Sequence, residues 1–274
     1  MQYTKLIADL LITCFILSGC SSPKQVEEKW TIVEEKAVTF EDGEYVDLWR
    51  NDLDSHDFYK LSDGETLLIV QEPTGPDNVY VGGVESLNDL NKTAQKAIIA
   101  YYEKQGLLYD LHIELKEAYS QYLKRKTNNE QFYDFLISQD IVPASSNDKM
   151  ICFLTSAILP IGDLGMRSGQ EIRLGAVFNK ETGEPYNIWD LFYSQKEEAV
   201  AQLLQASQIM DKQLISEMTK AIKPEYFILL PDNLEISFPR GSLPSQEHLY
   251  SLSIDYKDLE GVIHNLAIPG TNKH

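Results

Sequence analysis

The chain has 274 residues, with 24 Lys and Arg against 42 Asp and Glu, and a formal charge of −18 at pH 7. Its length allows one large or two modest domains with a buried core. A hydrophobic content of 43% excludes wholesale disorder, collagen and a polytopic membrane protein. So acidic a chain is poorly suited to nucleic acid, which needs a basic surface to displace counterions from phosphates, and we expect no such partner.

The first twenty residues have the pattern of an export signal. Lys5 precedes an apolar run over residues 10–17, which is too short to cross a bilayer core of about 30 Å as a helix. The run ends in Leu-Ser-Gly-Cys at residues 17–20, where small residues suit a peptidase cleft and the cysteine offers a thiol for lipid transfer. Residues 1–19 are therefore predicted to be a signal peptide, followed by a polar tether over residues 20–28.

This leader resembles a bacterial lipoprotein signal and matches its lipobox at all four positions. The resemblance implies cleavage between Gly19 and Cys20 and attachment of lipid, palmitate included, to Cys20. It also implies an exported protein, anchored to the membrane through its lipidated N-terminus on the extracytoplasmic side. The alternatives are an uncleaved anchor and an ordinary signal peptide.

Cleavage and lipidation would leave Cys152 as the single thiol of the mature chain. It lies in the apolar, strand-like run 150–154. A catalytic thiol needs a positive and partly exposed setting, so we expect a buried structural cysteine here.

Residues 29–145 are predicted to form an N-terminal α+β region. Its first part holds β-rich runs separated by turn signals, and its middle part repeats apolar residues at three- and four-residue steps, which predicts helices. A boundary is placed near Pro143, where Ser145, Ser146 and Asn147 break the pattern. The predicted strands cover 30–33, 45–49, 66–70 and 79–81, and the predicted helical segments cover 86–106, 108–122 and 132–136.

Residues 146–270 are predicted to form a C-terminal domain in which strands and helices alternate. Such blocks are typical of an α+β fold, with antiparallel sheets and helices packed on one face. The predicted strands cover 150–159, 171–178, 226–230, 234–238 and 250–254, and the predicted helices cover 197–222 and 256–264.

Three stretches of this half share the spacing of a known family. They are the strand and turn 176–184, the apolar segment 188–192, and the hairpin 226–238 followed by 252–259. On these stretches, residues from about 151 to 263 resemble the C-terminal domain of the RsiV family. That domain occurs in the lysozyme-sensing anti-sigma-V factor and beside the catalytic domain of some peptidoglycan deacetylases. The resemblance implies an RsiV-like fold of otherwise undefined function. Since the sequence shows neither a cytoplasmic segment nor a spanning helix, we do not expect an anti-sigma factor.

Two loops depart from the family pattern. The segment before the turn lacks the histidine that the family often carries. The loop before the final strand tends to be aromatic and small and to end in Gly in the family, whereas here residues 239–248 read Pro-Arg-Gly-Ser-Leu-Pro-Ser-Gln-Glu-His. Loops on a rigid scaffold carry recognition, so we expect ligand contacts in both loops. The candidate residues are Arg167, Ser168, Arg240, Gln246 and His248.

The sequence holds no complete catalytic or metal-binding motif. Gly-x-Ser-x-Gly is absent, and Ser-x-x-Lys at 21–24 and 146–149 lacks its partner motifs. The five histidines have no metal-ligand spacing. Residues 52–63 begin like an EF-hand loop but lack glycine at the sixth position and glutamate at the twelfth, so a solvated acidic loop is expected. We expect no catalytic residue, no metal and no cofactor.

The leading hypothesis is an envelope protein that binds a partner and catalyses nothing. Its acidic surface would attract a cationic protein such as a muramidase, more weakly as ionic strength rises. The alternatives are an envelope enzyme or accessory subunit acting on peptidoglycan, and a purely structural tether.

Overall fold

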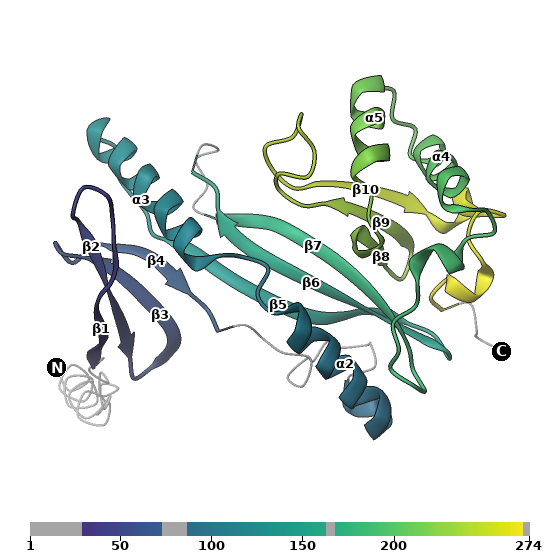
Figure 1. Cartoon of the computed structure of the whole chain (residues 1–274), viewed down its shortest axis with the longest axis horizontal. Helices are drawn as coiled ribbons and strands as arrows, with labels where there is room; N and C mark the ends of the chain where they lie inside the picture. Colours follow the sequence, from purple (N-terminus) through teal and green to yellow (C-terminus); the bar gives the residue numbers. More distant parts are fainter. Residues whose placement is uncertain (1–28, 73–86, 163–167, 271–274) are drawn as a thin grey trace, which may run out of the picture.

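The computed structural model describes residues 29–72, 87–162 and 168–270. The leader, the tether and the predicted strand at 79–81 lie outside these residues. Two sheets and four α-helices make up the described part, which confirms the predicted α+β class (Figure 1).

The larger sheet has seven strands in chain order. Neighbouring strands are antiparallel, except that β4 and β5 run parallel. A parallel pair needs a long crossover connection, and the helices of the middle segment lie within it. The strands are β1 (Trp30–Thr39), β2 (Tyr45–Asn51), β3 (Asp54–Leu61), β4 (Thr66–Val70), β5 (Phe135–Ser146), β6 (Met150–Pro160) and β7 (Ser168–Asn179).

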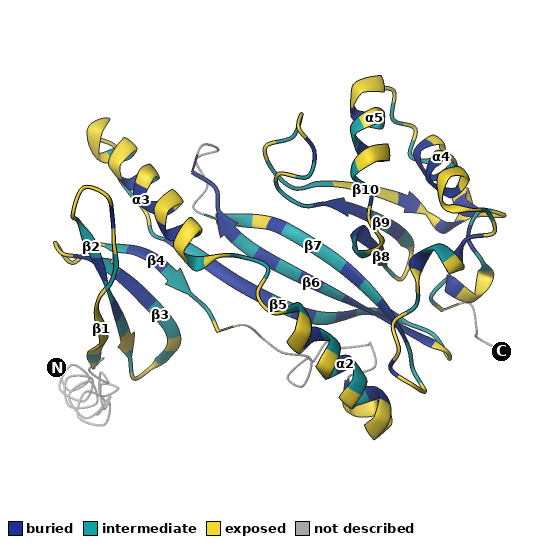
Figure 2. Cartoon of the chain, viewed as in Figure 1, coloured by how far each residue is buried: buried dark blue, intermediate teal, exposed yellow. Residues whose placement is uncertain are grey.

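The crossover contains a 3-10 turn, η1 (Leu87–Asp89), and the helices α2 (Lys92–Gln105) and α3 (Leu111–Thr127). Asn91 caps α2 and Asp110 caps α3, each accepting hydrogen bonds from two backbone amides of the first turn. Both helices pack on the same face of the large sheet, with their outer sides exposed (Figures 1 and 2). The two longer helices predicted for this segment are confirmed.

The second sheet has three antiparallel strands in the order β10-β9-β8. It packs against the face of β6 and β7 that α2 and α3 leave open, and α4 and α5 belong to the same apolar cluster. Its elements are η2 (Ile188–Leu191), α4 (Lys196–Ala206), α5 (Lys212–Ala221), η3 (Pro224–Tyr226), β8 (Phe227–Leu229), β9 (Asn233–Phe238), β10 (Tyr250–Asp255), η4 (Tyr256–Leu259) and η5 (Asn265–Ala267).

Three apolar clusters form the core. One lies between strands β2 to β6 and α3 around Leu115 and Ile137, and another lies between β5 to β7 and α2 around Ile98 and Phe153. The largest joins β6 and β7 to the second sheet and includes Cys152. Only 2% of Cys152 is exposed, so the prediction of a buried cysteine is confirmed.

Several predicted elements are wrong in detail. Residues 132–136 do not form a helix, because β5 begins at Phe135 and pairs with β4. The expected acidic loop at 52–57 enters β3, which begins at Asp54. The expected helix 197–222 is two helices, and the one expected at 256–264 ends at Leu259 as a 3-10 turn. Residues 145 and 146, where we expect a domain boundary, lie at the end of β5 and pair with β6, and the division into two domains stays a prediction.

Candidate functional site

The candidate ligand residues fall on two segments. Gly19, Cys20 and Arg167 lie outside the described residues. Ser168 opens β7, and its hydroxyl accepts a hydrogen bond of 2.7 Å from the Leu136 amide of β5, which makes it a structural contact. The remaining three, Arg240, Gln246 and His248, lie on the loop 239–249 between β9 and β10.

Arg240 points back into the protein. Its guanidinium donates to the Glu114 carboxylate of α3 at 2.6 Å and to the Pro160 carbonyl at 3.3 Å. Its backbone amide donates to the Glu171 carbonyl of β7 at 2.9 Å. One residue of the loop therefore ties β9 to α3, β6 and β7.

His248 makes the second contact of this loop. Its Nδ1 lies 3.1 Å from a carboxylate oxygen of Glu171. Gln246 is half-exposed, and its backbone amide donates a hydrogen bond to the Leu243 carbonyl, which closes a turn. The structure thus brings Arg240 and His248 together on two acids. We call Glu114, Glu171, Arg240 and His248 the charge cluster.

Both acids of the charge cluster are buried, with 4% of Glu114 and 1% of Glu171 exposed. Burial raises the pKa of Glu114, although Arg240 opposes the shift. Burial also raises the pKa of Glu171, with His248 and Arg240 opposing it. Groups so buried do not meet a ligand in solution, so the cluster acts as an internal clasp between the loop 239–249 and the large sheet.

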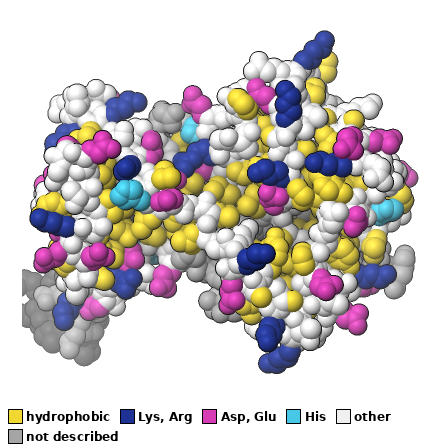
Figure 3. All heavy atoms as spheres, viewed as in Figure 1, with side chains coloured by type: hydrophobic (Ala, Val, Ile, Leu, Met, Phe, Trp, Pro, Cys, Tyr) yellow, Lys and Arg dark blue, Asp and Glu magenta, His cyan; other side chains and the backbone are white. Residues whose placement is uncertain are grey.

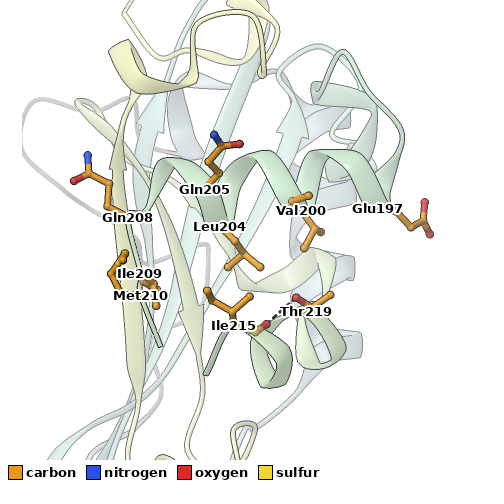
Figure 4. A pocket seen from close by; sticks show the side chains of 10 residues that line it. Glu197, Val200, Leu204, Gln205, Gln208, Ile209, Met210, Ile215 and Thr219 are labelled. Atoms are coloured by element: carbon orange, nitrogen blue, oxygen red, sulfur yellow. Dashed lines mark hydrogen bonds between the residues drawn. The ribbon is translucent and has the colours of Figure 1, made fainter. Parts of the chain in front are cut away.

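An apolar groove of about 850 Å³ lies between α4 and α5. Leu204 of α4 and Ile215 of α5 point toward each other across it, while Gln205 points away (Figure 4). Ile209 and Met210, from the connection between the helices, complete the lining. This groove is an apolar surface open to solvent, a feature that often marks a contact site for a partner.

The connection between α4 and α5 explains how the groove forms. Gln208 has a φ of +57°, the left-handed conformation that ends a helix, and Asp211 then caps α5 through the amides of Gln213 and Leu214. The chain reverses here and leaves Met210 90% exposed. The prediction of one helix over residues 197–222 misses this groove. The overlooked signal is Asp211, since an aspartate before an apolar run is a usual helix start.

The described residues contain neither a metal-ligand cluster nor a membrane-spanning helix. Across 29–72, 87–162 and 168–270, His, Cys, Asp and Glu do not gather in threes or more in a way that could hold a metal ion. Within that part of the chain, no helix is both long and apolar enough to span a membrane. Burial raises the pKa of Cys152 to about 12, which keeps its thiol protonated and unreactive at neutral pH.

Comparisons with solved structures include two distant likenesses to DUF3298 family proteins. No family model and no curated protein matches the chain. A DUF3298 family protein of Pseudomonas aeruginosa PAO1 (PA4972) is 14% identical, with a TM-score of 0.39 over 89% of this chain and 97% of its own. A DUF3298 family member of Bacteroides fragilis NCTC 9343 (BF2082) is 12% identical, with a TM-score of 0.38 over 87% of this chain and 94% of its own. At such scores, neither likeness assigns this chain to a family.

Proposed function

We propose that this chain is a lipid-anchored envelope protein that binds a protein partner and catalyses no reaction. The observation that carries the proposal is the groove between α4 and α5. Its lining is largely apolar, and Met210 within that lining is 90% exposed. A soluble surface keeps such apolar side chains together mainly where a partner covers them.

The charge of the chain supports a cationic partner, with a muramidase as the candidate. Residues 29–72 alone hold twelve Asp and Glu against four Lys and Arg. Figure 3 shows acidic side chains scattered among Lys and Arg over one face, with apolar side chains exposed between them. A field of this sign speeds the encounter with a basic protein, and the apolar groove then supplies the close contact.

A binding measurement tests this proposal. We expect the mature chain to bind a lysozyme-type muramidase, and affinity to fall about tenfold or more between 50 and 300 mM salt because the charges are screened. Cytochrome c, a basic protein without muramidase structure, is the control for charge alone. Equal binding of the two proteins would contradict a specific partner, and no binding at low salt would remove it altogether.

The groove itself is tested by Met210→Asp. An exposed methionine contributes little to folding, but a carboxylate in the contact should weaken muramidase binding about tenfold. The matched control is Ile113→Asp on α3, since Ile113 is 61% exposed and lies outside the groove. If the two variants bind equally well, the partner contacts another surface.

The lipid anchor gives a separate prediction. Cys20→Ser should abolish incorporation of labelled palmitate and release the mature chain from membrane fractions, because the acceptor thiol is gone. Cys14→Ser, within the leader, should leave labelling unchanged. Mass spectrometry checks both variants, and an unmodified Cys20 on membrane-bound wild-type protein would refute the anchor.

A further inference from the structure

The charge cluster joins three elements that are far apart in the sequence. Glu114 comes from α3, Glu171 from β7, and Arg240 and His248 from the loop 239–249. Among the described residues, one carboxylate oxygen of Glu114 and one of Glu171 are buried without a hydrogen-bond partner. Buried polar atoms are nearly always paired, so the two acids of the charge cluster are incompletely satisfied.

The shape of β7 sets up this arrangement. Ala157 pairs with Ile172 and Ile158 with Gln170, so Glu171 is the extra residue of a β-bulge. A bulge redirects a backbone carbonyl and a side chain away from the regular ladder. Here the carbonyl of Glu171 receives the Arg240 amide, and its carboxylate receives His248.

The charges of the cluster balance only with an added proton. Glu114 and Glu171 carry two negative charges, Arg240 carries one positive charge, and His248 adds a second only when protonated. The charge of Glu117, also on α3, acts on Glu114 in the same sense as Glu171 does. Outside the cluster, the Glu217 carboxylate of α5 accepts hydrogen bonds from the Ser245 hydroxyl at 2.6 Å and the Ser245 amide at 3.0 Å of the same loop, and these bonds lower the pKa of Glu217. Without the proton, one negative charge stays uncompensated among buried groups, which is unfavourable in a poorly solvated site.

We propose that the loop 239–249 is a proton-dependent latch, which closes on α3 and β7 when the charge cluster holds one added proton and loosens when it loses that proton. The latch goes beyond partner binding, since it concerns how the second sheet is held to the first. The loop carries both Arg240 and His248, so one opening event breaks the contacts to Glu114 and Glu171 together.

The direction of the pH effect follows from the two acids. Burial raises the pKa of Glu171 and of Glu114 in the folded protein. The folded state therefore binds more protons than the unfolded state at pH values above the ordinary carboxyl pKa. The stability that these acids contribute is complete below that ordinary pKa and is lost as pH rises through the raised values.

Hydrogen exchange of the loop amides tests the latch. In the wild-type chain, protection of the Arg240 amide, corrected for intrinsic exchange, should be about tenfold or more higher at pH 5 than at pH 8. Glu171→Gln mimics the protonated acid, so its protection should stay high at both pH values. The matched control is Glu235→Gln on β9, whose carboxylate binds Arg173 at 2.6 Å outside the cluster, and it should keep the wild-type pH dependence.

Three outcomes would overturn the latch. Protection of Arg240 in the wild-type chain could be equal at pH 5 and pH 8. Glu171→Gln could retain the wild-type pH dependence. Glu235→Gln could flatten it as much as Glu171→Gln does, which would assign the effect to net charge. The wild-type measurement stands by itself if Glu171→Gln fails to fold.

Discussion

Replacing Gly175 by alanine should lower the free energy of unfolding by about 3 kcal/mol or more, because the added carbon overlaps fixed backbone atoms. A Cβ at this position of β7 would lie 2.8 Å from the carbonyl carbon of Phe227 and 3.1 Å from the Cα of Ile228, and closer still to the Phe227 oxygen. Phe227 and Ile228 are fully buried at the start of β8. Neither strand can retreat without opening the core between the two sheets.

The same strand supplies a matched control. At Gly169 an added Cβ would meet only the side chain of Ile161, at its terminal Cδ1 and at Cγ1 3.3 Å away. A flexible side chain can rotate away, so Gly169→Ala should cost less than about 1 kcal/mol. Urea denaturation of both variants measures the difference. Equal unfolding midpoints would show that the approach of β8 to β7 does not require glycine.

The sequence predicted best those elements whose signals are local. The helices α2 and α3 combine an apolar stripe with a capping residue at each start, Asn91 and Asp110, and α2 ends at Gly106. These signals lie within a few residues of the structure that they specify. The strands β6 and β7 are predicted for a similar reason, since β6 is a long apolar run, β7 ends in one, and turn residues bound both.

Elements that depend on distant pairing were missed. Phe132, Phe135 and Leu136 have helical spacing, but the parallel pairing of Leu68 with Phe135 makes the segment a strand. A short apolar run does not distinguish the two structures by itself. The acidic residues before Phe58 likewise conceal β3, whose place is set by pairing with β2 and β4.

The charge cluster can be foreseen from the sequence only in part, and ligand contacts in the loop 239–249 stay a prediction. Unusual loop residues pointed to Arg240 and His248, but nothing near Glu114 or Glu171 in the sequence indicates that these acids are buried. Glu114 lies on a helix with charged neighbours, and its partner Arg240 follows 126 residues later. The charge cluster forms only through tertiary packing, which the periodicity and spacing of the sequence do not indicate.

Arg240→Ala is expected to lower the free energy of unfolding by about 3 to 5 kcal/mol, the usual effect of removing one partner of a buried ion pair. Glu114 would keep its buried carboxylate without the guanidinium at 2.6 Å, and the Pro160 carbonyl would lose its donor. Arg125→Ala is the control, since Arg125 lies 3.7 Å from a Glu130 side chain that is 53% exposed. A pair so exposed contributes less than about 1 kcal/mol. Urea denaturation at pH 7 compares the two variants.

A double replacement separates lost attraction from a stranded charge. Arg240→Met combined with Glu114→Leu removes both charges while keeping similar volume, so it should be markedly more stable than Arg240→Ala. The loss in free energy of unfolding caused by Arg240→Ala should also become smaller as pH falls from 8 to 5. Burial raises the pKa of Glu114, so the carboxylate left without Arg240 takes up a proton over this range. If the double variant lost as much free energy of unfolding as Arg240→Ala does, and the loss did not change with pH, then Arg240 would act through packing of its side chain rather than through its charge.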